Sequence, residues 1–287
     1  MVQDFTLHTH TIGFDGNNSI AEMAKYASQL GFKTIGFSNH FILHPDILTA
    51  PCYKYSKRGN YDNIYCDNFD KIMSRFVNHY HELEHVAASV GGKIRILRGL
   101  EADFFYYPTW EKQFRRAIQI LQPDYIIGAC HFVEHNGILC NVHDMANADA
   151  ENRDIMVRKY WQKIRDAAST GLFTWMAHLD LPKKKSVGQD EKWFDTEGQV
   201  IDTLAKYKVP VEVNTGLYRP YCNEPYPSPR IMRLISGTDL PVLFSDDSHH
   251  ISQIGRHFSD ACQLATECGI KKRLSLQKIL DFSNKTL

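Results

Sequence analysis

Short apolar segments alternate with longer amphipathic segments along most of the chain. The pattern Ser19-Ile20-Ala21-Glu22 is typical of a helix start, because the two polar side chains satisfy free backbone amides of the first turn. Apolar residues spaced three or four apart predict helices over 20–30, 69–90, 110–121, 150–169, 195–207, from 229 or 230, 251–267 and 274–283. Compact apolar runs predict strands beginning near residue 2 and covering 33–37, 93–101, 125–130, 173–177, 209–213 and 241–244.

The order of these elements predicts an α/β fold. Seven strand-then-helix units follow one another, and such alternation indicates a sheet of parallel strands. The strands are short and apolar, which is typical of a sheet covered on both faces. No internal repeat or linker divides the chain, so we expect one domain over residues 1–287, a length within the range of α/β barrels.

Residues 41–67 form a polar and aromatic segment with little periodicity, and we predict a loop there. A loop of this length within a compact domain is usually functional. This loop could act as a lid over a bound substrate, through Tyr53, Tyr55, Arg58 and Tyr61. The alternative is a surface loop without a role in binding.

Almost every predicted strand ends in a side chain that can bind a metal ion. His8 and His10 lie two apart on a strand, so both imidazoles point to the same face, and Asp15 follows in a glycine-bearing turn. The later strands end at His40, Glu101, His131, His178 and the pair Asp247 and His249. In a parallel barrel all carboxyl ends lie on one rim, where barrel active sites are found. We therefore expect these nine residues to converge.

This set of side chains predicts a centre with more than one metal ion. Imidazole and carboxylate ligands suit zinc, manganese or iron, and the absence of cysteine from the set argues against a purely structural zinc site. At three or four protein ligands for each ion, nine ligands predict two to three divalent ions. Each residue alone could be a capped or solvated polar group at a strand end. Their recurrence at successive strand ends favours the metal centre.

The composition argues against several classes of function, although a local basic patch remains possible. The 287 residues contain 33 Lys and Arg and 33 Asp and Glu, so the net charge is zero and offers no basic field for nucleic acid. No run of about 18 apolar residues predicts a membrane span, and the start of the chain does not read as a signal peptide. The seven cysteines include no Cys-x-x-Cys pair, which favours reduced thiols in the cytoplasm. The oligomeric state stays open.

These motifs resemble those of one known family. Over nearly its whole length the chain is similar to the PHP (polymerase and histidinol phosphatase) family, through His8-Thr9-His10, Asn39-His40, Glu101, His131, His178 and Asp247-Ser248-His249. The resemblance implies a distorted (β/α)7 barrel with up to three divalent ions at its C-terminal rim. It implies one ion on His8, His10, Glu101 and Asp247, a second that shares Glu101 and adds His131 and His178, and a third on Asp15, His40 and His249.

Within that family the chain looks most like the monofunctional histidinol-phosphate phosphatases. The length, the insertion after His40 and the segment from Val211 to Gly216 carry this likeness. Three residues depart from the family pattern. Thr6 and Asn39 stand where many members have Asp, and Asp15 stands where some relatives have His. We expect the first two to affect metal affinity rather than ligation.

The resemblance implies a metal-dependent phosphomonoesterase that hydrolyses L-histidinol phosphate through a hydroxide that bridges two ions. Asp247, His249 and Asp15 are the candidates for delivering a proton to the leaving alkoxide. Cationic side chains near the rim suit phosphate oxygens. The candidates are Arg219, Arg230 and Lys183, and each could equally be a solvated surface residue.

Two other functions remain open at this point. The enzyme could act on another small phosphoester, such as a nucleotide or sugar phosphate, or on a nucleic-acid end, which the neutral charge disfavours. The protein could also be a metal-binding scaffold without turnover. A decayed site should have lost ligands, whereas the pattern here is complete.

Overall fold

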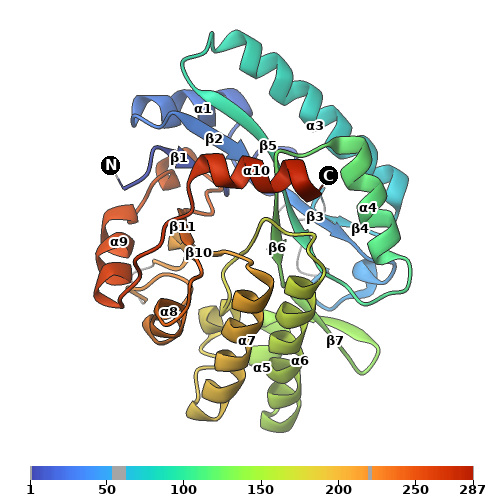
Figure 1. Ribbon diagram of the computed structural model, residues 1–287. Coiled ribbons are helices and arrows are strands. Elements are labelled where there is room, and N and C mark those ends of the chain that lie inside the picture. Colours follow the sequence, from blue (N-terminus) through green and yellow to red (C-terminus); the bar gives the residue numbers. More distant parts are fainter. Residues whose placement is uncertain (1, 54–62, 219–221, 287) are drawn as a thin grey trace.

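The computed structural model describes residues 2–53, 63–218 and 222–286, and within these ranges a nearly closed ring of seven parallel strands is surrounded by helices (Figure 1). Around the ring the strands are β1 (Phe5–Thr6), β2 (Thr34–Phe37), β5 (Arg95–Asp103), β6 (Tyr125–Ala129), β9 (Trp175–Met176), β10 (Val211–Asn214) and β11 (Val242–Ser245). Each pairs in parallel with the next. The predicted α/β barrel is confirmed.

The ring closes between its first and last strands without a regular ladder. The side-chain amide of Gln3 replaces a backbone group there: it donates to the carbonyl of Phe244 at 2.7 Å and accepts from the amide of Phe244 at 3.1 Å. Further along, Thr9 and Ser248 form an isolated parallel bridge. These contacts bring the ends of β1 and β11 together, where two groups of predicted ligands lie.

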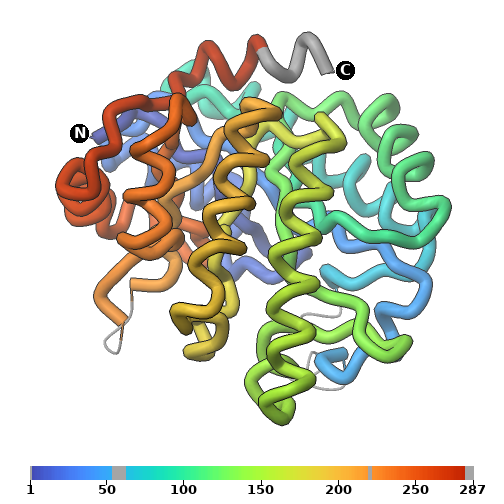
Figure 2. Tube along the Cα trace, turned by 60° about the horizontal axis from the view of Figure 1, so that its bottom comes forward, coloured from blue at the N-terminus to red at the C-terminus, as the bar shows by residue number. Residues whose placement is uncertain are grey.

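Helices cover the outside of the barrel. They are α1 (Ile20–Gln29), α3 (Phe69–Ser89), α4 (Trp110–Leu121), α6 (Ala150–Ser169), α7 (Phe194–Tyr207), α8 (Pro229–Ser236), α9 (Phe258–Glu267) and α10 (Leu276–Thr286). The predicted capping box is present at α1, where the side chains of Ser19 and Glu22 each accept from the backbone of the other. Figures 1 and 2 show α6 and α7 side by side along the barrel wall.

The predicted loop over 41–67 contains regular structure, and so does the segment between the predicted strand over 125–130 and the predicted helix over 150–169, where no element was predicted. The prediction was wrong in both places. The elements are β3 (His40–Leu43), β4 (Tyr65–Cys66), the antiparallel pair β7 (Phe132–His135) and β8 (Ile138–Asn141), and α5 (Val142–Asn147). β3 pairs with both β4 and β5, which extends the sheet beyond the ring. The suggested lid residues Tyr55, Arg58 and Tyr61 lie outside the described residues.

One end of the barrel is sealed by apolar side chains and by α10. Leu97, Tyr125 and Trp175 fill the interior, and Ile279 of α10 packs against the same cluster. α10 lies across this end in both views (Figures 1 and 2). Because the strands are parallel, their carboxyl ends all open at the opposite end, where the predicted ligands lie.

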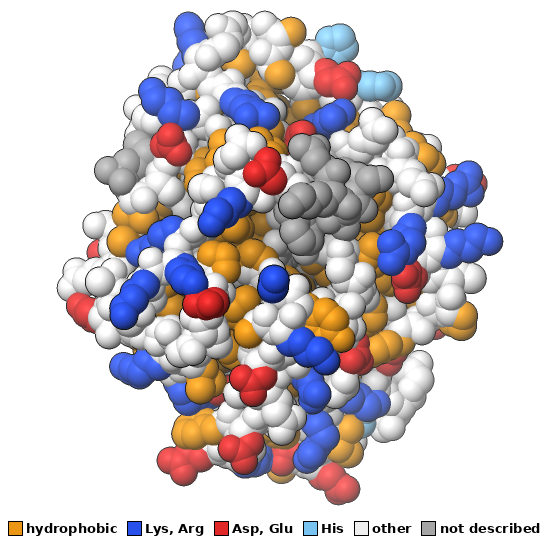
Figure 3. Space-filling view, viewed as in Figure 1, with side chains coloured by type: hydrophobic (Ala, Val, Ile, Leu, Met, Phe, Trp, Pro, Cys, Tyr) orange, Lys and Arg blue, Asp and Glu red, His pale blue; other side chains and the backbone are white. Residues whose placement is uncertain are grey.

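The surface carries charges of both signs. Figure 3 shows basic and acidic side chains intermingled over the face that α10 crosses. None of the described helices combines the length and apolarity that a membrane span requires. All seven cysteines are free thiols.

Candidate metal centre

The structure brings all nine predicted ligands together at the carboxyl end of the barrel. Four overlapping groups have ligand atoms within 4.8 Å of one another: His10, Asp15, His40 and His249; His8, His10 and Glu101; His8, His178 and Asp247; and His40, Glu101 and His131. Most of these side chains are buried. Residues from both ends of the sequence thus share one small volume.

Glu101 lies at the middle of the cluster. Its Oε2 atom is 2.8 Å from His40 Nδ1 and 3.3 Å from His8 Nε2. Its Oε1 atom is 3.0 Å from His178 Nε2 and 3.5 Å from His131 Nε2. The two oxygens of one carboxylate therefore face different sets of imidazoles, which is the arrangement that a bridging ligand requires.

Asp15 and Asp247 occupy two further positions around the same imidazoles. Asp15 Oδ2 is 3.2 Å from His40 Nε2 and 3.1 Å from His249 Nε2. Asp247 Oδ1 is 3.2 Å from His10 Nε2. The third ion site implied by the resemblance, with Asp15, His40 and His249, corresponds to one of the observed groups, which His10 also joins.

The local backbone explains how Asp15 and Asp247 reach these positions. The turn from Thr11 to Gly16 packs so closely that a Cβ at Gly16 would lie 2.5 Å from the His10 carbonyl, so only glycine fits. Asp247 has a φ of 48°, in the left-handed region that aspartate tolerates better than most residues. His10 N–H donates to Ser248 O at 2.8 Å, which ties the strand of His8 and His10 to the loop of Asp247.

The charges within the cluster stabilise one another. Burial pushes the pKa of Glu101 upward, but the nearby charges of His40, His8 and His131 hold that pKa well below its usual range. Burial likewise opposes protonation of His8, yet the carboxylates of Glu212, Asp247 and Glu101 raise its pKa well above the usual value. The carboxylates are thus anionic, and they favour a positive charge among the imidazoles that they face. This is the electrostatic environment of a cation site.

Several atoms of the cluster are buried without a hydrogen-bond partner in the described part of the chain. They include His8 Nε2, both ring nitrogens of His10, His40 Nδ1, Asp15 Oδ1 and Glu101 Oε2. Unsatisfied buried polar atoms are rare and costly in folded proteins. Imidazole nitrogens and carboxylate oxygens that converge in this way fit divalent ions such as zinc, manganese or iron.

Glu212 orients two of these ligands from behind. It is fully buried on β10 and accepts from His8 Nδ1 at 3.0 Å, so His8 turns Nε2 towards the cluster. It also accepts from the backbone amide of His178 at 3.1 Å, from Trp175 Nε1 at 3.2 Å and from Asn214 Nδ2 at 2.7 Å. Carboxylates in this position fix the tautomer and raise the basicity of a metal-binding histidine.

Asp103 supports His131 in the same manner. Its carboxylate accepts from His131 Nδ1 and from the His131 amide, both at 2.7 Å. Asp103 follows Glu101 by two residues on β5, so both side chains point into the barrel. The prediction from sequence missed Asp103 and Glu212. A carboxylate inside an apolar strand pattern is the signal that could have identified them.

Thr6 and Asn39, which depart from the family pattern, lie outside the four ligand groups. Thr6 Oγ1 donates to Asp246 Oδ2 at 2.9 Å. Asn39 accepts from the Thr11 amide and donates to His79 Nε2 at 2.9 Å. Both residues thus take part in hydrogen bonds beside the cluster.

A cavity of about 720 Å³ opens from the cluster. Asp15, His40, His131, His178, Asp247 and His249 form its inner end. Its outer part is lined by Ile42, Cys52, Ile64, Tyr65, Phe132, Asn141, Val142, His143, Asp144, Asn147, Leu181 and Lys184. The centre is therefore accessible to a small molecule.

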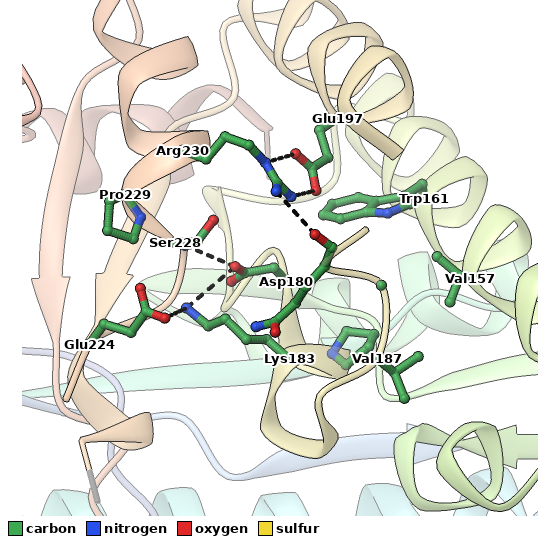
Figure 4. A pocket seen from close by; sticks show the side chains of 13 residues that line it. Val157, Trp161, Asp180, Lys183, Val187, Glu197, Glu224, Ser228, Pro229 and Arg230 are labelled. Atoms are coloured by element: carbon green, nitrogen blue, oxygen red, sulfur yellow. Dashed lines mark hydrogen bonds and ion pairs between the residues drawn. The ribbon is translucent and has the colours of Figure 1, made fainter. Parts of the chain in front are cut away.

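Of the three cations predicted to bind phosphate, the structure describes Lys183 and Arg230, and neither lines this cavity. Lys183 lies in a separate pocket, where it pairs with Asp180 at 3.4 Å (Figure 4). It also donates to the Pro225 carbonyl at 2.6 Å. Arg230 lies in the same pocket and pairs with Glu197. Their positions do not support direct phosphate contact. Arg219 lies outside the described residues, and its predicted role stays a prediction.

Comparison with known proteins adds a family and several relatives. The PHP domain matches residues 4–216. A protein of Deinococcus radiodurans named "Probable histidinol-phosphatase" is 28% identical over 190 residues, which cover 66% of this chain and 70% of the relative. A protein of Schizosaccharomyces pombe with the same name is 21% identical over 290 residues, covering 94% of this chain and 89% of the relative.

Two solved structures share the fold. One, from Listeria monocytogenes, has a TM-score of 0.69 at 21% identity and covers 89% of this chain and 99% of its own. The other is histidinol phosphate phosphatase from Lactococcus lactis, complexed with zinc, L-histidinol and phosphate. It has a TM-score of 0.67 at 16% identity and covers 96% of this chain and 97% of its own.

Proposed function

The chain belongs to the PHP domain family, and on that premise we propose that it is a metal-dependent phosphomonoesterase that hydrolyses L-histidinol phosphate to L-histidinol and phosphate. The convergence of nine imidazole and carboxylate ligands at the open end of the barrel carries this proposal. The names of the two curated relatives and the L-histidinol and phosphate bound to the Lactococcus protein support the substrate.

The residues of the cluster would hold two to three divalent ions. Glu101 is the best placed bridging ligand, because its two oxygens face different imidazoles. When bound, the ions would lower the pKa of water towards about 7 and neutralise charge on the phosphate. Glu212 and Asp103 would keep His8 and His131 in the tautomers that present Nε2 to the cluster.

The remaining roles belong to side chains that reach the cavity. Among the proton-donor candidates, the side chains of His249 and Asp247 are 29% and 21% exposed, whereas that of Asp15 is 3% exposed. Burial pushes the pKa of Asp247 upward, but His8, His10 and His249 hold it well below its usual range, so this carboxylate has no proton to give. We therefore favour His249 for delivering a proton to the leaving oxygen. Lys184 lines the cavity directly after Lys183, and its charge would attract the phosphate group.

The proposal extends to the setting of the reaction. We take residues 1–287 as one domain that acts on a small phosphate ester rather than on nucleic acid or a membrane surface. The balanced charge supports this choice of partner, since nucleic-acid binding depends on a basic field. Free thiols suit a reducing compartment, which supports the cytoplasm as the place of reaction.

Phosphate release from a panel of phosphomonoesters tests the substrate. Purified protein loaded with Zn²⁺ or Mn²⁺ would be assayed with L-histidinol phosphate, nucleotide monophosphates and sugar phosphates. The proposal expects kcat/KM for L-histidinol phosphate to exceed the others by at least about tenfold, which corresponds to about 1.4 kcal/mol of transition-state binding. Equal rates across the panel would instead favour another small phosphoester as the substrate.

A further inference from the structure

The cavity is lined by a second set of polar side chains, which do not belong to the metal cluster. They are Asn141, His143, Asp144 and Asn147, on and beside the short helix α5. Asp15 and Asp247 belong to the metal cluster. Among the described lining residues, Asp144 is therefore the one carboxylate that the metal centre does not use.

Asp144 has an incomplete set of partners. Its Oδ2 atom accepts from the Asn141 amide at 2.9 Å, which completes the capping box of α5. A carboxylate has two oxygens with about four acceptor sites, so this bond leaves capacity for further donors. Burial and the hydrogen bond from the Asn141 amide are the only influences of the described residues on the pKa of Asp144, and no charged side chain is among them. Burial raises the pKa of Asp144, as is usual for a half-buried carboxylate without a cation nearby.

Tyr65 and Cys52 connect this carboxylate with the metal cluster. The Tyr65 side chain contacts Cys52 through a hydrogen bond, and the negative charge of Asp15 also acts on Tyr65. The charge of Asp144 in turn acts on Cys52. All four side chains line the same cavity, so a molecule that fills it would meet both metal ligands and Asp144.

The substrate of the proposed function has complementary chemistry. A phosphate is anionic, and L-histidinol phosphate carries an ammonium group and an imidazole on its organic part. Resting on that proposed function, we propose that Asp144 determines specificity by binding a nitrogen group of the substrate that bears N–H and can carry positive charge. The mixed surroundings suit this end of the molecule, since Val142 and Leu181 offer apolar contact while Asn141 and Asn147 offer amides.

Asp144→Asn tests the proposal while preserving the helix cap. The amide oxygen of asparagine can still accept from the Asn141 amide, whereas the negative charge is lost. The matched control is Asp149→Asn, since Asp149 caps the next helix, α6, by accepting from the Asn152 amide at 2.8 Å and does not line the cavity. Thermal unfolding of both metal-loaded variants would verify that they are folded.

Four phosphate esters separate the possible contacts. L-histidinol phosphate carries both nitrogen groups, 3-(imidazol-4-yl)propyl phosphate lacks the amine, L-phenylalaninol phosphate lacks the imidazole, and ethyl phosphate lacks both. Asp144→Asn should lower kcat/KM for L-histidinol phosphate by about 10- to 100-fold, the range for a hydrogen bond to a charged group. It should leave ethyl phosphate unchanged, and the analogue that becomes insensitive identifies the nitrogen that Asp144 binds.

Binding of L-histidinol itself, measured by calorimetry on metal-loaded protein, keeps this test independent of turnover. A 10- to 100-fold weaker affinity in Asp144→Asn, but not in Asp149→Asn, would support the role of Asp144 even if L-histidinol phosphate were not hydrolysed. In that case only the proposed function would fall. Equal losses on all four esters, or unchanged affinity for L-histidinol, would overturn the role of Asp144 whatever the activity.

Discussion

Replacing Glu212 with glutamine is expected to weaken metal binding although Glu212 is not itself a predicted ligand. The side chain is fully buried, and its two oxygens accept from four donor groups: the His8 ring, the His178 amide, the Trp175 indole and the Asn214 amide. Burial pushes the pKa of Glu212 upward, but the charge and hydrogen bond of His8 hold it below its usual value. The native group is therefore an anionic acceptor.

The structure sets the size of the effect. Glutamine fills the same volume, but its NH₂ group cannot accept a hydrogen bond. If NH₂ takes the place of Oε2, the Trp175 indole loses its acceptor; if it takes the place of Oε1, the His178 and Asn214 amides lose theirs. At about 1–3 kcal/mol for each stranded donor, the free energy of unfolding should fall by roughly 1–3 kcal/mol in the first case and roughly 2–6 kcal/mol in the second. Loss of a carboxylate behind a metal-binding histidine typically weakens metal binding by about 10- to 100-fold.

Two measurements on Glu212→Gln and a matched variant separate these effects. Chemical denaturation of chelator-treated protein gives the loss of stability, and competition with a chelator of known affinity gives the dissociation constant for Zn²⁺. The control is Glu197→Gln, which also removes a buried carboxylate but one that pairs with Arg230 outside the centre. It should destabilise the fold and leave Zn²⁺ affinity unchanged.

The comparison between the variants can refute the reasoning. If Glu212→Gln bound Zn²⁺ as tightly as the wild type, or if Glu197→Gln lost the same affinity, Glu212 would have no specific role in orienting His8. A loss of stability alone would then reflect only the removal of a buried acceptor.

Two further changes test titration and packing near the centre. Burial lowers the pKa of His79 to about 4, and the neutral ring accepts a hydrogen bond from Asn39. The neutral ring therefore stabilises the fold above pH 6.5. This contribution to the unfolding free energy is lost as the pH falls towards 4. Between pH 7 and pH 5, metal-free wild type should lose about 2 kcal/mol more unfolding free energy than His79→Gln, and parallel pH profiles would contradict this. A Cβ at Gly99 would lie 2.2 Å from the Tyr125 ring, whereas a Cβ at Gly198 meets nothing within 4 Å. In denaturation experiments the free energy of unfolding should therefore fall by about 1–3 kcal/mol in Gly99→Ala and rise by about 0.5–1 kcal/mol in Gly198→Ala. A Gly99→Ala variant as stable as the wild type would argue against this packing.

The sequence predicted the elements with strong periodicity and clear ends. The helix predicted over 110–121 is α4, Trp110–Leu121, and the helix predicted over 150–169 is α6, Ala150–Ser169. Both have an apolar stripe that can only be buried against the sheet. The strand-end ligands were also accessible to prediction, because parallel strands bring their carboxyl ends to one rim whatever lies between them.

The β7–β8 hairpin was missed although it has a sequence signal. Asn136 and Gly137 have φ values of 51° and 72°, which suit a tight hairpin turn, and Asn-Gly is the commonest pair for it. The flanking strands are only four residues each, too short to show a period. β3 escaped prediction for the same reason, since its four residues are all buried and do not alternate.

The sequence can mark the supporting carboxylates as unusual, but their partners could not be assigned without tertiary structure, and neither could Lys184 be assigned to the cavity. Glu212 lies between Val211 and Val213, and the sequence does not show which strand's imidazole it faces. Lys183 and Lys184 are neighbours in a short 3₁₀ helix, Leu181–Lys185, where each residue turns by about 120°. Adjacent lysines therefore point into different pockets, and sequence position near a strand end does not decide between them.

Metal reconstitution of the wild-type protein tests the central claim most directly. Chelator-treated protein would be titrated with Zn²⁺ or Mn²⁺ while bound ions per chain and phosphate release from L-histidinol phosphate are measured on the same samples. The account predicts no hydrolysis without metal and activity that rises to a plateau as two to three ions bind. Hydrolysis by metal-free protein, or a fully loaded centre that releases no phosphate from any phosphomonoester, would contradict it.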